Sequence, residues 1–380
     1  MKFIIERSVY NALLNKVKKN LFSSNDENAM KYIVHELTSD GLKLIATNFK
    51  SRSEFFLPVG KYIQIIEPGT SCILGQKLSE LVSVFSDGEI CIHTEKSNNS
   101  ENACISKTNN KNKNVHWIPC CDISIYPINE FVLTNNNVRR CKFNAQVFKS
   151  ILKNVEFATS NDENSDISLS NVELNVGEEE ITACGVSFEM ISYSIIKRSS
   201  IDIEGTGLFY IMNVAIKDFI GLLDDLNEVE IFTDDKLLVV KQLNFIYCFR
   251  MLEASFPNWR EKILIQNDFN LVVSKEQIVN SLKQIKIISP VCRFCIMNNE
   301  IKINSINCDD LSSAIGSGEC AIECVANGDG SFIVVIELIM EVINRVSSED
   351  VIFRYSNNPN LPISILINEE TSAIVGTVRE

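Results

Sequence analysis

The sequence has 380 residues, of which 45% are hydrophobic and 22% are charged. These proportions are typical of globular proteins and exclude collagen-like, low-complexity and wholly disordered chains. The length is too great for one compact core and predicts two or three domains. No stretch reaches the roughly 18 uncharged apolar residues that cross a bilayer, and no signal peptide is recognisable. We therefore expect a soluble, cytoplasmic protein.

Cysteine content and charge narrow the possibilities further. The chain contains 13 cysteines. Without a secretory signal, they are expected to be reduced thiols that are mostly buried as small apolar side chains. Lysine and arginine number 36 against 49 acidic residues, which gives a formal net charge of −13. This total argues against a simple nucleic-acid-binding protein, because phosphate contacts need a basic surface. Whether the protein can bind nucleic acid therefore depends on where the basic residues lie along the chain.

One pattern occurs three times along the chain: an amphipathic helix, a hairpin, a second helix and a strand. The first helices are expected at Ser8–Asn20, Lys142–Val155 and Ser274–Ile287. The hairpin turns are expected at Ser39–Gly41, Gly177–Glu179 and Asn298–Glu300, where alternating segments flank polar residues. The second helices are expected at Gly75–Phe85, Asn213–Leu226 and Phe332–Val346. This recurrence predicts three copies of one α+β domain.

Polar or proline-containing segments separate the three copies. The boundaries are expected near residues 126–137 and 257–268. A further segment, residues 97–114, is almost free of apolar side chains and is expected to be a mobile loop inside the first copy.

Basic residues are concentrated on the first helix of each copy and its lead-in segment. Residues 8–20, 139–153 and 274–286 together contain 11 basic residues and a single acidic one, Glu276. In the second copy, helical geometry places Lys142, Lys149 and Lys153 opposite the apolar face. In the third copy, Lys283 and Lys286 fall near the apolar arc and are expected to extend along it. The alternative is that these lysines have no role in binding and only make the exposed faces of the helices hydrophilic.

The opening segment Met1–Arg7, the hairpins, the size of the three copies and the tract Phe256–Arg260 together resemble the bacterial sliding clamp, the β subunit of DNA polymerase III. The tract reads Phe-Pro-Asn-Trp-Arg and is similar to the family's Phe-Pro-Asp-Tyr-Arg. The resemblance covers essentially the whole chain. It implies an α+β fold of three tandem DNA-clamp domains, at residues 1–128, 129–264 and 265–380. Two such chains would form a homodimer that closes into a ring, with helices lining the central hole.

The resemblance also implies a function and a set of site residues. The function is that of a non-catalytic processivity factor that encircles duplex DNA and tethers the replicative polymerase. The residues expected to contact DNA without sequence specificity are Lys16, Lys19, Arg139, Arg140, Lys142, Lys149, Lys153, Lys275 and Lys283. The dimer interface is expected at His116, Ile118, Ile287 and Ile288. The expected protein partners are the DNA polymerase III catalytic subunit and the clamp loader, which would dock short peptides in a pocket formed by Thr182, Gly185, Phe188, Met190, Pro257, Ile374, Val375 and Val378.

The sequence departs from the family pattern at several of these places. Residues Gly185–Met190 replace the family's Thr-Asp-Gly-His-Arg-Leu, and Gly376–Val378 replaces Met-Pro-Met. The loop Phe22–Asp26 lacks the family's arginine, and a tyrosine pair is absent near Ser165 and Asp166. We therefore expect a pocket of altered polarity and a weaker or redistributed contact with DNA.

Residues suited to catalysis are few. The three histidines, His35, His93 and His116, each lie in a strand-like pattern, which favours structural or surface roles over acid–base catalysis. No phosphate-binding glycine loop is present. Cys292 and Cys295, with Cys320 and Cys324, have a spacing that suggests zinc, but the first pair lies in a strand-like run rather than a tight turn. No cofactor or metal is predicted. A metal or thiol enzyme, and a clamp-like scaffold without DNA binding, remain as alternatives.

Overall fold

The computed structural model describes residues 1–22, 28–97, 100–108, 114–127, 131, 133, 138–160, 166–251, 255–264, 267–306 and 317–378. The chain divides into two compact units. Unit 1 comprises Met1–Ala145 and Lys217–Leu252, and unit 2 comprises Gln146–Ile216 and Glu253–Glu380.

The first third of the chain begins with a strand and a helix, continues through several strands to a second helix, and ends in three strands. The elements are β1 (Lys2–Glu6), α1 (Arg7–Val17), β2 (Tyr32–Thr38), β3 (Gly41–Thr47), β4 (Ser51–Pro58), β5 (Ile63–Glu67), β6 (Gly69–Leu74), α2 (Gly75–Val84), β7 (Glu89–Ser97), β8 (Ser100–Lys107) and β9 (Val115–Cys121).

The second third follows the same order. Its elements are β10 (Arg139–Asn144), α3 (Ala145–Lys153), β11 (Asn171–Val176), β12 (Glu180–Val186), β13 (Met190–Lys197), β14 (Ile203–Glu204), β15 (Gly207–Met212), α4 (Asn213–Phe219), β16 (Glu228–Thr233), β17 (Leu237–Gln242) and β18 (Phe245–Arg250).

The last third repeats the order once more, after a short helix. Its elements are α5 (Trp259–Lys262), β19 (Phe269–Ser274), α6 (Lys275–Lys286), β20 (Val291–Met297), β21 (Glu300–Ser305), β22 (Glu319–Glu323), β23 (Val325–Ala326), β24 (Gly330–Val335), α7 (Ile336–Arg345), β25 (Asp350–Tyr355), β26 (Ile363–Asn368) and β27 (Thr371–Val375). The α+β class and the recurring element order are confirmed.

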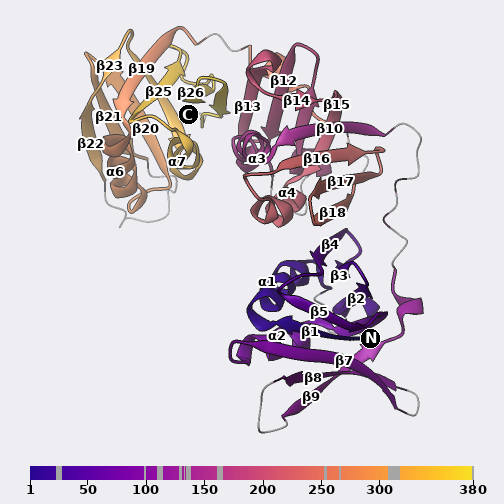
Figure 1. Ribbon diagram of the computed structural model, residues 1–380. Helices are drawn as coiled ribbons and strands as arrows, with labels where there is room; N and C mark the ends of the chain where they lie inside the picture. Colours follow the sequence, from indigo (N-terminus) through magenta and orange to yellow (C-terminus); the bar gives the residue numbers. More distant parts are fainter. Residues whose placement is uncertain are drawn as a thin grey trace. The chain divides into compact units, whose positions relative to one another are not determined.

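Unit 1 is a long antiparallel sheet that carries helices α1 and α2. Its strands are hydrogen-bonded in the order β10-β16-β17-β18-β4-β3-β2-β6-β9-β8-β7-β1-β5. Helix α1 contacts α2 and packs on β3 and β4, whereas α2 packs on β2 and β6 (Figure 1). Tyr10, Leu14 and Val17 of α1 are fully buried. Their spacing of three to four residues places them on one helical face, which leaves the opposite face of α1 to its polar residues.

Unit 2 contains two antiparallel sheets and the helix pair α6 and α7. One sheet has the order β15-β11-β12-β13-β27-β26-β25-β19-β23, and the other has the order β22-β21-β20-β24. The pairing of β13 with β27 joins a strand of the second third to a strand of the last third. Ile278, Leu282 and Ile285 of α6 are buried in a core shared with Phe294 and Phe353. This apolar stripe explains why α6 lies against the sheets.

The three predicted hairpin turns are confirmed. Each polar turn lies between paired strands: β2 and β3, β11 and β12, and β20 and β21. In the last turn, Asn298 and Asn299 have positive φ values of 52° and 62°. Asparagine tolerates this left-handed backbone better than most residues, which is why it is common in tight hairpins.

Several predicted boundaries are wrong, and strand pairing is the reason for each. Lys142 was expected in a helix but lies in β10, because β10 pairs along its whole length with β16. Phe332–Val335 lies in β24 rather than in the second helix of the last copy, because it pairs with β20. A short apolar run has no periodicity that distinguishes a strand from a buried helix.

The expected mobile loop at residues 97–114 is also wrong in its central part. Strand β8 occupies Ser100–Lys107 and pairs with β7 on one side and β9 on the other. Ala103, Cys104 and Ile105 are buried. These three residues suffice to fix the strand, although the segment as a whole is polar. Residues 98, 99 and 109–113 lie outside the described part of the chain.

Candidate nucleic-acid and protein interfaces

The predicted DNA-contacting lysines of α1 lie on its polar side. Lys16 is exposed, and so is Lys19 in the short 3-10 turn Lys18–Asn20 that follows α1. The Nζ of Lys16 lies 6.0 Å from the ring centroid of Phe55. Burial raises the pKa of Asp218, whereas its hydrogen bond from Tyr247 and the charge of Lys19 act in the opposite direction. Lys19 therefore has a partly buried acidic neighbour, whereas Lys16 lies above an aromatic ring.

Three predicted DNA contacts, Arg139, Arg140 and Lys142, lie on strand β10 rather than on a helix. All three form ion pairs: Arg139 with Asp235, Arg140 with Glu230 at 2.7 Å, and Lys142 with Glu228 at 2.6 Å. Arg140 also lies over the ring of Phe232, at 5.3 Å. Cross-strand pairs of this kind stabilise a sheet and neutralise the charges that they join. Much of this basic group is therefore already compensated within the sheet.

Helices α3 and α6 present a different arrangement. Lys153 of α3 is exposed and Lys149 is half-buried, on the side opposite the buried Ile151. Lys275, at the start of α6, donates hydrogen bonds to the carbonyl oxygens of Val346 at 2.6 Å and Asn344 at 3.4 Å. Cations are favourable at a helix C-terminus, so Lys275 caps α7.

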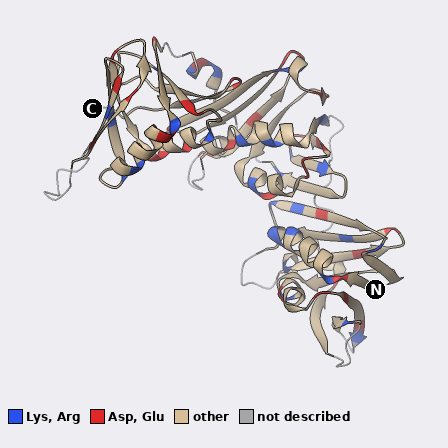
Figure 2. Ribbon diagram, turned by 60° about the vertical axis from the view of Figure 1, so that its left-hand side comes forward, with Lys and Arg blue, Asp and Glu red and all other residues tan. Residues whose placement is uncertain are grey.

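The lysines of α6 reach the solvent. Both Lys283 and Lys286 are exposed, and Lys286 is 3.7 Å from Glu337. Of the nine predicted DNA contacts, Lys16, Lys19, Lys153 and Lys283 therefore have exposed side chains on helices or helix ends. Figure 2 shows basic and acidic residues along the helices and strands of both units.

The predicted peptide pocket is divided between two faces of the sheet in unit 2. Register places Met190 opposite Val375, and both are buried in the core that contains α6 and α7. Gly185 lies on that same face, where an added Cβ would collide with the carbonyl oxygen of Val155. Thr182 and Ile374 point to the opposite face, because side chains alternate along a strand. The structure thus separates these residues rather than bringing them together.

The remaining pocket residues lie at the ends of elements. Phe188 is 82% exposed at the turn between β12 and β13. Val378 is 37% exposed beyond β27, and its backbone N–H donates to the carbonyl oxygen of Ile333 at 2.9 Å. Pro257 is half-buried just before α5. The N–H of Gly376 donates to the carbonyl oxygen of Glu189 at 2.8 Å, which fixes the C-terminal segment beside the Phe188 turn.

The face that contains Ile374 carries an aromatic cluster that the pocket prediction missed. Ile374 belongs to a buried cluster with Leu169, Cys184, Val186, Ile191 and Trp259. The Nε1 of Trp259 donates to Glu173 at 2.9 Å, and its ring lies 5.8 Å from that of Tyr193. The guanidinium of Arg260 lies 4.8 Å from the centroid of the Trp259 ring.

Arg260 connects this cluster to strand β12. It donates to Thr182 Oγ1 at 3.2 Å and lies 3.5 Å from Glu180. The tract Phe256–Arg260 was the sequence signal for this cluster. Its tryptophan identified an aromatic position, but sequence alone does not reveal which sheet face the tract covers.

The predicted dimer-interface residues lie beside two strand edges, one in each unit. In unit 1, β6 pairs with β9 only at Cys120 and Cys121, so the preceding residues of β9 have a described strand partner only in β8. In unit 2, β22 is the outer strand of its sheet among the described residues. An unpaired strand edge is a template for pairing with another chain.

The end of helix α2 lies beside the β9 edge, where Phe85 contacts His116, and helix α6 lies beside the β22 edge. His116 is exposed on β9, whereas Ile118 is buried. Ile287, which follows α6, is 87% exposed, and Ile288 is half-buried. Helix α6 packs on β22. The two sets of predicted interface residues therefore share one arrangement, a helix end next to a strand edge.

The described cysteines and histidines do not form the zinc site that their spacing suggested. The zinc spacing is not realised, because Cys292 is buried and Cys295 faces the other side of β20. In the described part of the chain, the group of potential metal ligands that meets is a different one, His93, Glu95 and Cys104. His35 lies fully buried on β2, where its Nε2 is 2.6 Å from the hydroxyl of Tyr10.

Comparison with known proteins agrees with this architecture. No family model matches the sequence. A beta sliding clamp from Chlamydia muridarum is 20% identical over 335 residues, which are 87% of this chain and 85% of that protein. The crystal structure of the DNA polymerase beta subunit from Streptococcus pyogenes superposes with a TM-score of 0.86 at 18% identity, and each chain is covered completely. The chain has the bacterial sliding-clamp fold.

A second solved clamp gives the same result. The DNA polymerase sliding clamp from Bacillus subtilis has a TM-score of 0.88 at 16% identity and covers 100% of this chain and 99% of that one. The clamp fold is thus preserved over the full length while the sequence has diverged. Two of the divergent places lie partly outside the described residues: the loop 23–27 and Ser165. Asp166 is described, and it accepts a hydrogen bond from the N–H of Ser168 at 3.0 Å.

The described part of the chain contains no helix that combines the length and the apolar character needed to cross a membrane.

Proposed function

We propose that this protein is a DNA sliding clamp, in which two chains close head to tail around duplex DNA and tether a replicative polymerase. The full-length likeness to solved clamps is the observation that carries the proposal. In this proposal the chain has three clamp domains, at residues 1–128, 129–264 and 265–380, and acts in the cytoplasm without catalysing a reaction. Retention depends on a closed ring, so contacts with DNA need only be weak.

Ring closure is proposed at the two strand edges. Strand β9 of one chain would pair with β22 of the other, and the helix end that carries Ile287 would cover apolar surface beside His116 and Ile118 of the partner. Main-chain hydrogen bonds between edges supply affinity, and apolar side chains beside them supply specificity.

DNA contact is proposed for the exposed lysines Lys16, Lys19, Lys153 and Lys283, with Lys149 beside them. Ammonium groups opposite phosphates attract DNA without reading its sequence, which permits sliding. Arg139, Arg140, Lys142 and Lys275 are proposed to contribute less to DNA contact, because each of these side chains already has a protein partner.

Peptides of the DNA polymerase III catalytic subunit and of the clamp loader are proposed to dock next to the Phe188 turn and the C-terminal segment. Phe188 and Val378 provide apolar surface there. Of the other predicted pocket residues, Thr182 and Ile374 lie on one face of the adjoining sheet, Gly185, Met190 and Val375 lie on the opposite face, and Pro257 directly precedes the tract that covers the Ile374 face. An apolar anchor residue in such a place is a common mode of peptide recognition.

Primer extension tests the proposal. A polymerase that dissociates after short products should make products at least about tenfold longer when this protein and a clamp loader are added, because tethering raises its effective concentration at the primer end. Unchanged product lengths would contradict the proposal. They would favour the second candidate, a clamp-like scaffold with weakened DNA binding, for which the ion pairs of β10 are the specific observation.

A further inference from the structure

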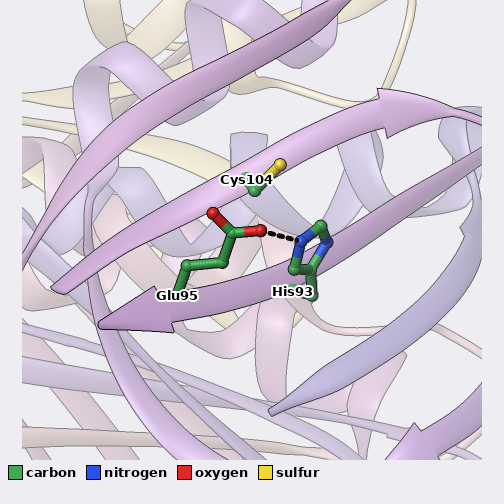
Figure 3. A group of neighbouring side chains, drawn as sticks. All are labelled: His93, Glu95 and Cys104. Carbon is green, nitrogen blue, oxygen red and sulfur yellow. Dashed lines mark hydrogen bonds and ion pairs between the residues drawn. The ribbon is translucent and has the colours of Figure 1, made fainter. Parts of the chain in front are cut away.

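A histidine, a carboxylate and a thiol meet on the outer face of the sheet in unit 1. Along β7, Ile90 and Ile92 are buried, so the alternate residues His93 and Glu95 point to the opposite face. On β8, Cys104 lies directly opposite His93 in the antiparallel register. Figure 3 shows the three side chains together, with the imidazole of His93 directed at the carboxylate of Glu95.

We propose that His93, Glu95 and Cys104 bind a divalent transition-metal ion of the zinc class. This site goes beyond the proposed clamp function and does not depend on it. The two strands supply its ligands in a rigid arrangement, since two come from alternate positions of β7 and the third comes from the facing position of β8.

The distances suit such an ion. One potential ligand atom from each residue lies within 4.8 Å of the other two. The His93 Nε2 and a Glu95 oxygen are 2.9 Å apart. Around a tetrahedral zinc ion, bonds of about 2.0 to 2.3 Å place neighbouring ligand atoms about 3.4 Å apart. Small side-chain rotations, without movement of the strands, would therefore bring the three atoms into range.

One ring nitrogen of His93 lacks a hydrogen-bond partner among the described residues. This atom, Nδ1, is shielded from solvent. Ring nitrogens buried in this way normally have a partner, because an unsatisfied polar atom is costly. A ligand at this site would supply one, either directly or by turning the ring.

The chemistry of the three donors selects the class of ion. A thiolate and an imidazole favour zinc and related transition metals over magnesium and calcium, which prefer oxygen ligands. The thiolate and the carboxylate together would balance the charge of a divalent ion. Cys104 is 4% exposed, whereas the side chain of Glu95 is 57% exposed, so the thiol forms the floor of the site and a water molecule can complete the coordination on the solvent side.

Titration of the metal-free, full-length protein with Co²⁺ and then with Zn²⁺ tests this site. We expect one Co²⁺ per chain with a thiolate-to-cobalt absorption band, which Zn²⁺ then displaces. Cys104→Ser should abolish the band, and His93→Gln and Glu95→Gln should each weaken Zn²⁺ binding at least about tenfold. His93 and Glu95 are partly exposed, so these two variants are expected to fold.

Cys295→Ser is the control, because Cys295 is another thiol on a strand, although it is half-buried where Cys104 is buried, and it lies in unit 2. It should leave the band unchanged. The proposal is overturned if the wild-type protein binds no Zn²⁺ at micromolar concentration, or if Cys104→Ser and Cys295→Ser bind it equally well. Cys91 lies two residues before His93 on the same strand, β7. Loss of the band in Cys91→Ser, with the band retained in Cys104→Ser, would also overturn the ligand assignment.

Discussion

His116 packs edge-on against Phe85, with ring centroids 5.7 Å apart and an interplanar angle of 76°. Phe85 follows helix α2, and His116 is on β9, so this contact joins a helix end to the strand edge of unit 1. In unit 2, a methyl group added at Gly318 would come within 2.6 Å of Ile288. Gly318 directly precedes the edge strand β22, so the end of α6 lies close to that edge as well. The proposed ring closes through these two similar arrangements.

Changing Ile287 to Asp is expected to weaken the dimer. The side chain is 87% exposed in the single chain, so the variant should fold normally. If the partner chain covers Ile287, the substitution loses apolar burial of about 2 kcal/mol and also buries a charge, which should raise the dimer dissociation constant at least about tenfold. Sedimentation velocity across a dilution series measures this constant.

Leu226→Asp is the matched control for the dimer experiment. Leu226 is 91% exposed in the turn before β16 and belongs to neither set of predicted interface residues. It should leave the dissociation constant unchanged. Equal dissociation constants for Ile287→Asp and the wild type would remove the α6 end from the interface.

Reversing the charge of two lysines on α3 is expected to weaken DNA retention. In the double variant Lys149→Glu, Lys153→Glu, about two phosphate contacts are lost, so the dependence of log affinity on log salt should become shallower by about 1.8. A double variant on strands of the same unit, Lys197→Glu with Lys302→Glu, makes the same change in net charge. If both double variants lose affinity equally, the effect is one of total charge and not of the helix.

Gly185→Ala is expected to destabilise the protein whether or not Gly185 contacts a peptide. Its Cβ would collide with the carbonyl oxygen of Val155, and overpacking of this kind costs about 1 to 3 kcal/mol. Gly221→Ala is the control, because a Cβ at Gly221 meets nothing within 4 Å. Thermal unfolding should show a lower midpoint for the first variant and a nearly unchanged one for the second. Equal midpoints would show that the sheet near Gly185 is more open than described.

His35 is expected to make stability depend on pH. Burial lowers its pKa to about 4, whereas its hydrogen bond to the carbonyl of Ile33 acts in the opposite direction. Because that carbonyl can only accept, Nδ1 carries the proton and Nε2 accepts from Tyr10. Between the folded pKa and the usual value near 6.5, the unfolded chain binds more protons, so stability falls as the pH is lowered.

The size of this effect can be measured by urea unfolding. His35 should contribute a loss of about 2 kcal/mol in the free energy of unfolding between pH 7 and pH 5. In His35→Gln this contribution should be absent, although the variant is less stable at both values. A pH dependence identical to that of the wild type would mean that folding does not lower the pKa of His35.

Sequence periodicity predicted the helices best where an apolar stripe was regular. The expected helix Ser274–Ile287 corresponds to α6 at Lys275–Lys286, and Gly75–Phe85 corresponds to α2 at Gly75–Val84. The expected helix Asn213–Leu226 is much shorter, because α4 ends at Phe219 and only a 3-10 turn follows through Leu222. Gly221 and the acidic residues after it continue the apolar pattern poorly and favour a turn.

The candidate sites were less accessible to sequence reasoning, because they depend on partners far away in the chain. The charges of Arg140 and Lys142 were visible, but their partners Glu230 and Glu228 lie about 90 residues away and are brought to diagonal positions by the pairing of β10 with β16. Likewise, Ile374 and Val375 are adjacent in sequence yet lie on opposite faces of β27. Strand register decides which residues lie opposite each other and which sheet face each side chain points to, and register cannot be read from composition.

Retention on circular DNA tests the central claim most directly. The protein should be loaded onto a nicked circular plasmid by a clamp loader with ATP and separated from free protein by gel filtration at moderate salt. A closed two-chain ring predicts that protein stays with the circle and is released when a restriction enzyme cuts the plasmid once, because the ring slides off the ends. Equal retention on circular and linear DNA, or no retention on either, would contradict the account.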